Sequence, residues 1–120
     1  FNNIGEYIKI EANVALGEFS YLGGAGGLVI GKDTIIGQYF SAHPENHNFM
    51  DMSKLIRLQG VNRAGIKIGN NCWIGSKVTI LDGVVLGNNC VVAAGAVVTR
   101  SFADNVMVGG IPAKIIRDLK

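Results

Sequence analysis

Apolar residues recur at every sixth position along most of the chain, and this period dominates the sequence. In the second half an aliphatic residue opens each hexad, a glycine often follows it directly, and a second apolar residue comes four positions after the first. The opening residues are Ile68, Ile74, Ile80, Leu86, Val92 and Val98, and the fourth-offset residues are Cys72, Val78, Val84, Cys90, Ala96 and Phe102. Such a fixed period predicts one repeated structural unit.

The same template runs through the first half with two interruptions. Its aliphatic positions there are Ile4, Ile10, Leu16, Leu22, Ile30 and Ile36, with a shift of two residues at the sequence GGAGG. The pattern stops after Ala42 and restarts at Ile68. We therefore expect one domain over residues 1–120. It would have coils at about 4–42 and 66–103, an excursion loop at 43–65 and a C-terminal segment at 104–120.

A hexad predicts short strands rather than helices. A glycine at every sixth position would cost a helix about 1 kcal/mol each, whereas Val, Ile and Thr favour strands and glycine permits the bends between them. A strand of a few residues cannot bury its own apolar face, but stacked turns of a coil bury it. Three hexads make an eighteen-residue triangular turn, so the period predicts an all-β fold, a parallel β-helix.

Two nearly identical segments support eighteen residues as the length of one coil. IGNNCW (68–73) and LGNNCV (86–91) are eighteen positions apart, so they would lie one above the other at the spacing of about 4.8 Å between neighbouring strands. Their asparagines would then form amide ladders between turns. Cys72 would stack on Cys90 with nearly parallel Cβ vectors, which suit a disulfide poorly. We expect two small buried thiols and, without any C-x-x-C spacing, no zinc site.

Composition and charge narrow the possible partners. The formal net charge is only +2, and the basic residues are scattered, so a nucleic-acid partner is not indicated. No run of eighteen apolar residues predicts a membrane span. The opening sequence FNNIGEYIKI lacks the basic-then-apolar pattern of a secretory signal, so we expect a cytoplasmic protein.

The hexads, the excursion with both histidines, and the ending VGGIPAKIIRDLK together resemble the hexapeptide-repeat acyltransferases, a family of sugar, galactoside and antibiotic O-acetyltransferases. The most specific segments are NHNF (46–49), IGNNCWIGSKVTILDGVVLGNNCVVAAGAVVTR (68–100) and GGIPAKIIR (109–117). The resemblance implies a left-handed coil, a homotrimer with active sites between subunits, and acetyl-CoA as the acyl donor. We also expect AKIIRDLK (113–120) to form a short C-terminal helix.

Acyl transfer to a hydroxyl requires a base whose pKa lies near neutrality, and histidine fits this need. The resemblance assigns the base to His47, which lies in the segment Asn46-His47-Asn48-Phe49. His43 is the minor candidate, because Pro44 after it favours an extended backbone near the end of the coil. A long ordered insertion in a repeat protein is itself typical of function. Glu45 is close enough in sequence to orient an imidazole.

The remaining site residues come from the resemblance. In similar enzymes the backbone N–H after Trp-Ile-Gly stabilises the oxyanion of the reaction, which here is the N–H of Ser76. The expected acetyl-CoA contacts are Trp73, Gly75, Ala94, Thr99, Arg100, Lys114 and Arg117. Two alternatives remain open: Trp73 packs under the excursion or a neighbouring subunit, and Lys114 and Arg117 form only the polar face of the C-terminal helix.

We expect acetyl-CoA-dependent O-acetylation of a carbohydrate, such as a sugar of a surface polysaccharide or its precursor. N-acetylation of an amino sugar and acetylation of an antibiotic are the nearest alternatives. A carbonic anhydrase on the same fold needs three histidine ligands per zinc, and the chain has only two histidines. A non-catalytic solenoid would not account for a histidine-bearing excursion beside WIGS and GxPAK. Residues 50–65, with Lys54, Arg57 and Arg63, are expected to shape the acceptor pocket or to contact the neighbouring subunit.

Overall fold

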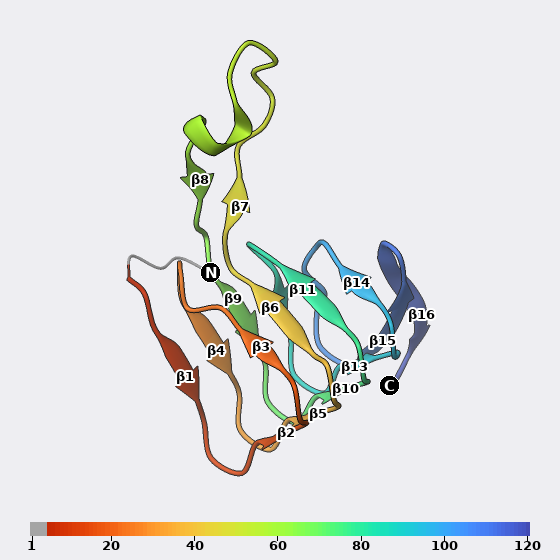
Figure 1. Cartoon of the computed structure of the whole chain (residues 1–120). Helices are drawn as coiled ribbons and strands as arrows, with labels where there is room; N and C mark the ends of the chain where they lie inside the picture. The colour runs from red at the N-terminus through yellow and green to blue at the C-terminus, as the bar shows by residue number, and fades with distance from the viewer. Residues whose placement is uncertain (1–4) are drawn as a thin grey trace.

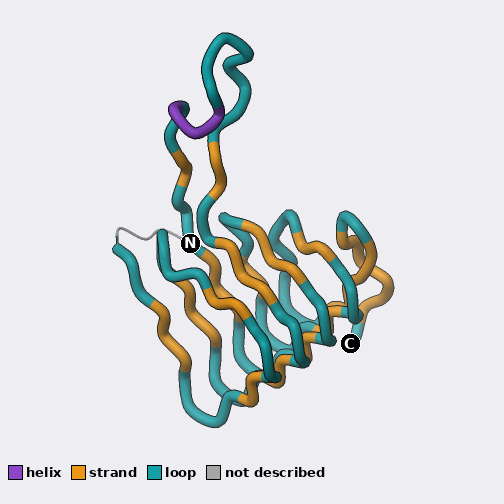
Figure 2. The backbone as a smooth tube through the Cα atoms, viewed as in Figure 1, coloured by secondary structure: helices purple, strands orange, loops and turns teal. Residues whose placement is uncertain are grey.

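The computed structural model describes residues 5–120, so the predicted hexad position Ile4 lies outside the described residues. The described chain is an elongated stack of short strands, 48 × 28 × 27 Å, with one long projection (Figures 1 and 2). The elements are β1 (Ile8–Ile10), β2 (Ala15–Leu16), β3 (Tyr21–Leu22), β4 (Leu28–Ile30), β5 (Ile35–Ile36), β6 (Ser41–His43), β7 (Asn46–His47), the 3-10 helix η1 (Ile56–Leu58), β8 (Val61–Asn62), β9 (Ile66–Ile68), β10 (Trp73–Ile74), β11 (Thr79–Leu81), β12 (Val85–Leu86), β13 (Val91–Val92), β14 (Val97–Val98), β15 (Val106–Gly110) and β16 (Ala113–Asp118).

The strands form three parallel sheets that the chain visits in rotation. Sheet A has the order β1-β4-β9-β12, sheet C has β3-β6-β11-β14, and sheet B runs from β2 through β5, β10 and β13 to β15, with β16 antiparallel at its edge. Each circuit of A, B and C adds one strand to every sheet. The prediction of an all-β fold of stacked parallel coils is confirmed.

The strand register shows which coils are longer or shorter than eighteen residues. Trp73 pairs with Val91, eighteen positions on, as predicted. Ala15 pairs with Ile35, twenty positions on, because GGAGG adds two residues to that coil. The last coil is two residues shorter, so that Phe102 bridges to Leu86, sixteen positions earlier. The prediction for Phe102 is therefore wrong: its ring occupies the opening aliphatic position of a hexad and not the fourth offset.

The core consists of the inward-facing hexad residues. It runs continuously through the coil and holds Leu28, Ile30, Ile36, Phe40, Ala42, Ile66, Ile68, Cys72, Ile74, Val78, Ile80, Val84, Leu86, Cys90, Val92, Ala96 and Val98, among others. Both cysteines are free and buried, as expected. Hydrogen bonding to the Cys90 side chain and burial both raise the pKa of the Cys72 thiol, which keeps it protonated.

One corner of the coil carries the predicted amide ladder. The Nδ2 group of Asn71 donates to Oδ1 of Asn89 at 2.9 Å, and that of Asn89 donates to Oδ1 of Asn105 at 3.0 Å. These three residues have φ between 54° and 62°. Asparagine tolerates this left-handed conformation better than other side chains because it makes local hydrogen bonds. The sequence NN therefore both turns the corner and ties neighbouring coils together.

The C-terminal segment corrects one prediction. Residues 113–118 form strand β16 and not a helix, and they pair antiparallel with β15 in sheet B. The β-branched Ile115 and Ile116 favour a strand, and pairing satisfies the backbone of an edge that the coil would otherwise leave open. Lys114 and Arg117 consequently lie on a strand.

The interruption begins one residue later than predicted, because His43 belongs to β6 and pairs with Leu81. Residues 44–65 form the excursion, which contains β7, η1 and β8 and projects from the coil (Figure 1). The strands β7 and β8 pair antiparallel as its stem.

Candidate active site

The structure brings four of the predicted site residues into one groove. The groove has a volume of about 480 Å³. It lies along the corner where the chain passes from sheet B to sheet C, and its lining is Gly37, Gln38, Trp73, Gly75, Ser76, Val91, Val92, Ala93, Ala94 and Met107. Trp73, Gly75, Ser76 and Ala94 thus come together from two successive coils.

At the corner that carries the amide ladder, where the chain passes from sheet A to sheet B, the first backbone N–H group of each turn is satisfied within the coil. The N–H of Lys32 donates to Oδ1 of Asn70 at 3.0 Å, and the N–H of Asn70 donates to Oδ1 of Asn88 at 2.8 Å. The N–H of Asn88 donates to Oδ1 of Asp104 at 2.7 Å. Each of these residues is the first of its turn, and the asparagine or aspartate of the next coil accepts a hydrogen bond from its backbone N–H group.

The groove corner lacks such acceptors. The equivalent turn residues are Gln38, Ser76 and Ala94, and within residues 5–120 their backbone N–H groups have no hydrogen-bond partner. Three neighbouring coils therefore present a column of open donors along the groove. Open donors at a coil edge are what a ligand with carbonyl or oxyanion groups requires.

Gly75 is required by the spacing between coils. A Cβ at this position would lie 2.6 Å from the nitrogen and 2.8 Å from the Cα of Ala94. Trp73 projects from sheet B between Ile35 and Val91 and is 60% exposed. Within one chain, Trp73 does not pack under the excursion, so it is free to form a wall of the groove.

His47 lies elsewhere, in a second pocket at the stem of the excursion. We call it the histidine pocket; its volume is about 240 Å³ and its lining is Tyr21, Gly23, Gly24, Ala25, His43, Pro44, Glu45 and His47. His47 is on β7, opposite Val61 of β8, and its imidazole makes no hydrogen bond to any described residue. His43 shares the pocket and stacks on Tyr21. Tyr21 was not predicted, because neither the hexad pattern nor a motif distinguishes it.

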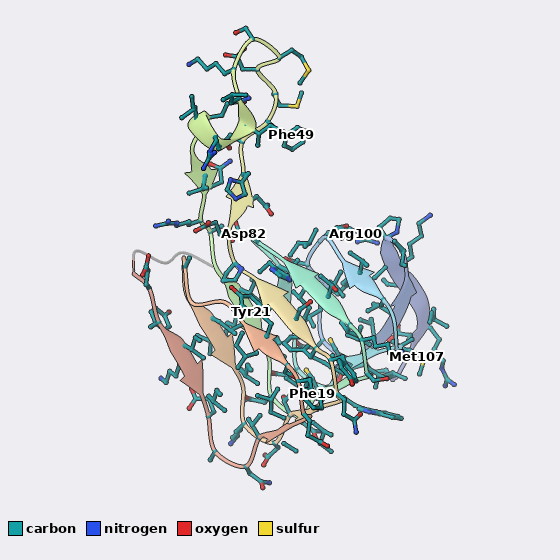
Figure 3. The ribbon with its side chains drawn as sticks, in the orientation of Figure 1. Phe19, Tyr21, Phe49, Asp82, Arg100 and Met107 are labelled. Carbon is teal, nitrogen blue, oxygen red and sulfur yellow. The ribbon has the colours of Figure 1, made fainter. Side chains whose placement is uncertain are left out.

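Two charged contacts fix the base of the excursion: Asp82 ties it to the coil, and an ion pair joins its two sides. The Asp82 carboxylate accepts the N–H of Ala64 at 3.0 Å and that of Gly65 at 2.8 Å, and Figure 3 shows Asp82 where the excursion meets the coil. Nε of Arg63 donates to Oε2 of Glu45 at 2.7 Å. Glu45 therefore bonds Arg63 and neither histidine, contrary to the role suggested from sequence.

The far end of the excursion is organised by Gln59. Its side chain donates to the backbone oxygens of Asp51 and Lys54 at 2.9 and 3.0 Å and accepts the N–H of Asp51 at 3.1 Å. Hydrogen bonds from the side chain and backbone of Ser53 lower the pKa of Asp51. Large apolar side chains around this end are exposed; they are Phe49, Met50, Met52, Leu55, Ile56 and Leu58.

The four remaining expected acetyl-CoA contacts, Thr99, Arg100, Lys114 and Arg117, divide into two sets. Arg117 pairs with Met107, which lines the groove, and Lys114 pairs with Gly109, two residues further along β15. Thr99 and Arg100 follow β14 at the corner where the chain leaves sheet C, and neither lines the groove. The Arg100 guanidinium lies 4.4 Å from the centroid of the Phe102 ring. The structure therefore brings Arg117 near the groove but not Thr99 or Arg100.

One chain does not bring His47 to Ser76. No residue lines both the groove and the histidine pocket, and the two lie at different corners of the coil. Among residues 5–120 there is no cluster of three or more His, Cys, Asp or Glu side chains arranged to hold a metal ion. The described residues also contain no helix long and apolar enough to cross a membrane.

Comparison with known proteins identifies related sequences. Residues 65–100 match the family described as bacterial transferase hexapeptide (six repeats). WbbJ of Escherichia coli (strain K12), which is named for O-acetyl transfer in lipopolysaccharide biosynthesis, is 30% identical over 117 residues, covering 92% of this chain and 60% of WbbJ. Galactoside O-acetyltransferase of the same organism is 37% identical over 79 residues, covering 66% of this chain and 36% of that protein. The chain thus spans three fifths or less of these relatives.

Solved structures agree. A hexapeptide-repeat acetyltransferase from Vibrio cholerae O1 biovar eltor, VCA0836 complexed with acetyl coenzyme A, superposes with a TM-score of 0.73 at 29% identity, covering 94% of this chain and 65% of that one. A galactoside acetyltransferase in complex with coenzyme A gives 0.66 at 27% identity, covering 94% and 64%. The resemblance inferred from the hexads and motifs is confirmed: the chain is a relative of the hexapeptide-repeat acetyltransferases.

Proposed function

We propose that this chain forms the catalytic coil of an acetyl-CoA-dependent O-acetyltransferase that acts on a carbohydrate. The observation that carries the proposal is the column of open N–H groups on Gln38, Ser76 and Ala94, at a corner lined by small residues and one exposed tryptophan. Relatives named for galactoside O-acetylation and for O-acetyl transfer in lipopolysaccharide biosynthesis, and a related structure that holds acetyl coenzyme A, support the same class of reaction.

The groove fits the acyl donor. The pantetheine arm of coenzyme A carries amide groups, which the open N–H column would bind, and Gly75 and Ala94 leave its path clear of bulky side chains. Arg117 and Lys114, on the strand beside Met107, supply cations for the phosphates. The donor contributes an activated thioester, and the N–H of Ser76 would donate to its carbonyl oxygen as negative charge develops there.

His47 is the base in this proposal, and a second subunit supplies the groove. The histidine pocket and the groove are separate in one chain, so a left-handed coil assembled as a homotrimer would place the excursion of one subunit against the groove of the next. The exposed apolar side chains at the far end of the excursion support such a contact, since large apolar surfaces on a projection are costly in water. An imidazole without other polar partners is free to accept the proton of an acceptor hydroxyl as its oxygen attacks the thioester carbonyl. When the C–S bond breaks, the same imidazolium would return the proton to the departing thiolate of coenzyme A.

The test is an acceptor screen with acetyl-CoA that measures release of free thiol. The panel holds simple sugars, an amino sugar and chloramphenicol, so that O-acetylation, N-acetylation and antibiotic acetylation are separated by the product formed. We expect release with a sugar hydroxyl and a fall in kcat of about a hundredfold or more for His47→Ala.

His43→Ala is the matched control, because His43 lines the same pocket. We expect it to retain most of the kcat. Full activity of His47→Ala, or a greater loss in His43→Ala than in His47→Ala, contradicts the assignment of the base. Absence of thiol release with every acceptor contradicts the enzyme.

A further inference from the structure

Tyr21 is an exposed aromatic side chain held in place within the histidine pocket. Its ring and that of His43 are stacked, with centroids 5.2 Å apart and planes 24° from parallel. Tyr21 nevertheless remains 57% exposed. Figure 3 shows it on the coil, on the side from which the excursion leaves. A large ring that is fixed by a neighbour and still open to solvent offers a flat surface to a ligand.

The pocket beside this ring is small and has a smooth wall. The adjoining Gly23, Gly24 and Ala25 contribute almost no side-chain volume, and a Cβ on Gly23 would come within 2.8 Å of Cδ of Pro44. The volume of about 240 Å³ lies below the range of about 300–1,000 Å³ that is usual for drug-sized ligands. It therefore suits a single ring.

The polar groups of the pocket favour a neutral ligand with hydroxyl groups. The Glu45 carboxylate is paired with Arg63 at 2.7 Å, so its charge is compensated while its oxygens keep lone pairs for further donors. His47 supplies an acceptor nitrogen in the same pocket. An aromatic face beside hydroxyl-accepting groups is complementary to a sugar ring, whose C–H groups are weakly positive and whose hydroxyls donate.

We propose that Tyr21 is the platform of the acceptor subsite, against which a neutral pyranose ring stacks with one hydroxyl at His47. His43 is a positioning residue that holds the Tyr21 ring, and Glu45 accepts a hydroxyl of the same sugar. The inference rests on the proposed acetyl transfer and adds to it the residue that selects a ring-shaped acceptor. Specificity then depends on a side chain from the third hexad of the chain, outside the excursion.

The experiment compares cyclic and acyclic acceptors in the full chain. Methyl β-D-galactopyranoside and methyl α-D-glucopyranoside present a rigid ring face, whereas sorbitol presents similar hydroxyls without one. With acetyl-CoA as donor, we expect Tyr21→Ala to raise the KM for the pyranosides about five- to tenfold. Its kcat, its KM for acetyl-CoA and its kcat/KM for sorbitol should stay within about twofold of the wild type. Tyr21→Phe keeps the ring and should retain the wild-type KM.

Tyr39→Ala is the matched control. Tyr39 is 56% exposed and stacks on Phe19 at 5.5 Å, so it is as exposed and as stacked as Tyr21, but it does not line the histidine pocket. We expect it to leave the pyranoside KM unchanged. Saturation-transfer NMR with the same two pyranosides measures binding without catalysis, and size-exclusion chromatography checks assembly.

Three results would overturn the platform: no binding of either pyranoside to the wild type, an unchanged pyranoside KM in Tyr21→Ala, or loss of assembly in Tyr21→Ala with the KM unaffected. Failure of the acetyl transfer looks different. If the pyranosides bind to the wild type by NMR and this binding is lost in Tyr21→Ala, the platform is supported. If the wild type then releases no thiol, the proposed reaction is contradicted.

Discussion

The spacing between coils sets a sharp test at Gly75. Gly75→Ala would add a Cβ 2.6 Å from the Ala94 nitrogen, and ordinary van der Waals contact begins at 3.4 Å, so the two coils must separate locally by about 0.8 Å. Hydrogen bonds flank this point: Gly75 N–H to Val92 O and Gly95 N–H to Ser76 O, both 2.9 Å. A separation of that size would stretch both bonds beyond hydrogen-bonding distance.

The expected cost follows from these contacts. Overpacking against backbone atoms costs about 1–3 kcal/mol, and two weakened hydrogen bonds add about 1 kcal/mol. We therefore expect Gly75→Ala to lose about 2–4 kcal/mol, which for a chain of this length lowers Tm by about 8–16 °C. Thermal unfolding followed by circular dichroism at one fixed protein concentration measures it, since assembly makes Tm depend on concentration.

Two other glycines supply matched controls. A Cβ on Gly24 would meet its nearest atom, Cγ1 of Ile8, at 3.4 Å, so Gly24→Ala should change stability by less than about 0.5 kcal/mol. Gly95 has φ of +76° and nothing within 4 Å of an added Cβ, so Gly95→Ala should cost about 1 kcal/mol through its backbone alone. Equal Tm values for Gly75→Ala and Gly24→Ala would refute the argument that coil separation requires glycine at position 75.

Two further predictions concern backbone groups at the two corners. Ser76→Ala should keep kcat for acetyl transfer within about twofold, because the proposal uses only its N–H; a loss beyond about tenfold in the thiol-release assay would show that the hydroxyl takes part. Asn88→Ala removes the acceptor that the N–H of Asn70 reaches at 2.8 Å, so urea unfolding should show a loss of about 1 kcal/mol. Glu18→Ala, at an exposed corner position without a side-chain hydrogen bond, is its control, and equal unfolding midpoints for the two variants would contradict a role for the ladder.

The excursion shows where prediction from sequence stopped. The end of the hexads marked its boundaries to within one residue, and the difference arises because His43 continues the pairing of β6 with Leu81. Its internal order depends on Gln59 and its attachment on Asp82, and neither residue belongs to a motif. Gln59 reaches residues five and eight positions earlier inside a loop whose path no period specifies, whereas Asp82 bonds Ala64, one coil length away.

The predicted C-terminal helix was wrong for a different reason. AKIIRDLK has helix-compatible spacing and strand-favouring isoleucines, so local preference leaves both structures open. The open edge of β15 decided between them, because pairing across a sheet edge satisfies more backbone groups than one short isolated helix. Only the position of sheet B at the end of the coil contains that information.

The sequence by itself determined the coil. A period of six, with aliphatic residues that must be buried and glycines and asparagines that turn corners, leaves stacked parallel strands as the arrangement that buries every hexad. Tertiary structure decided the chemistry of the corners. Both corners repeat every coil, yet the groove corner lacks the side-chain acceptors of the ladder corner, so the N–H groups of Gln38, Ser76 and Ala94 stay open. Tertiary structure also decided that Tyr21 shares a pocket with His47, because these residues are far apart in the sequence and meet only after a full coil has formed between them.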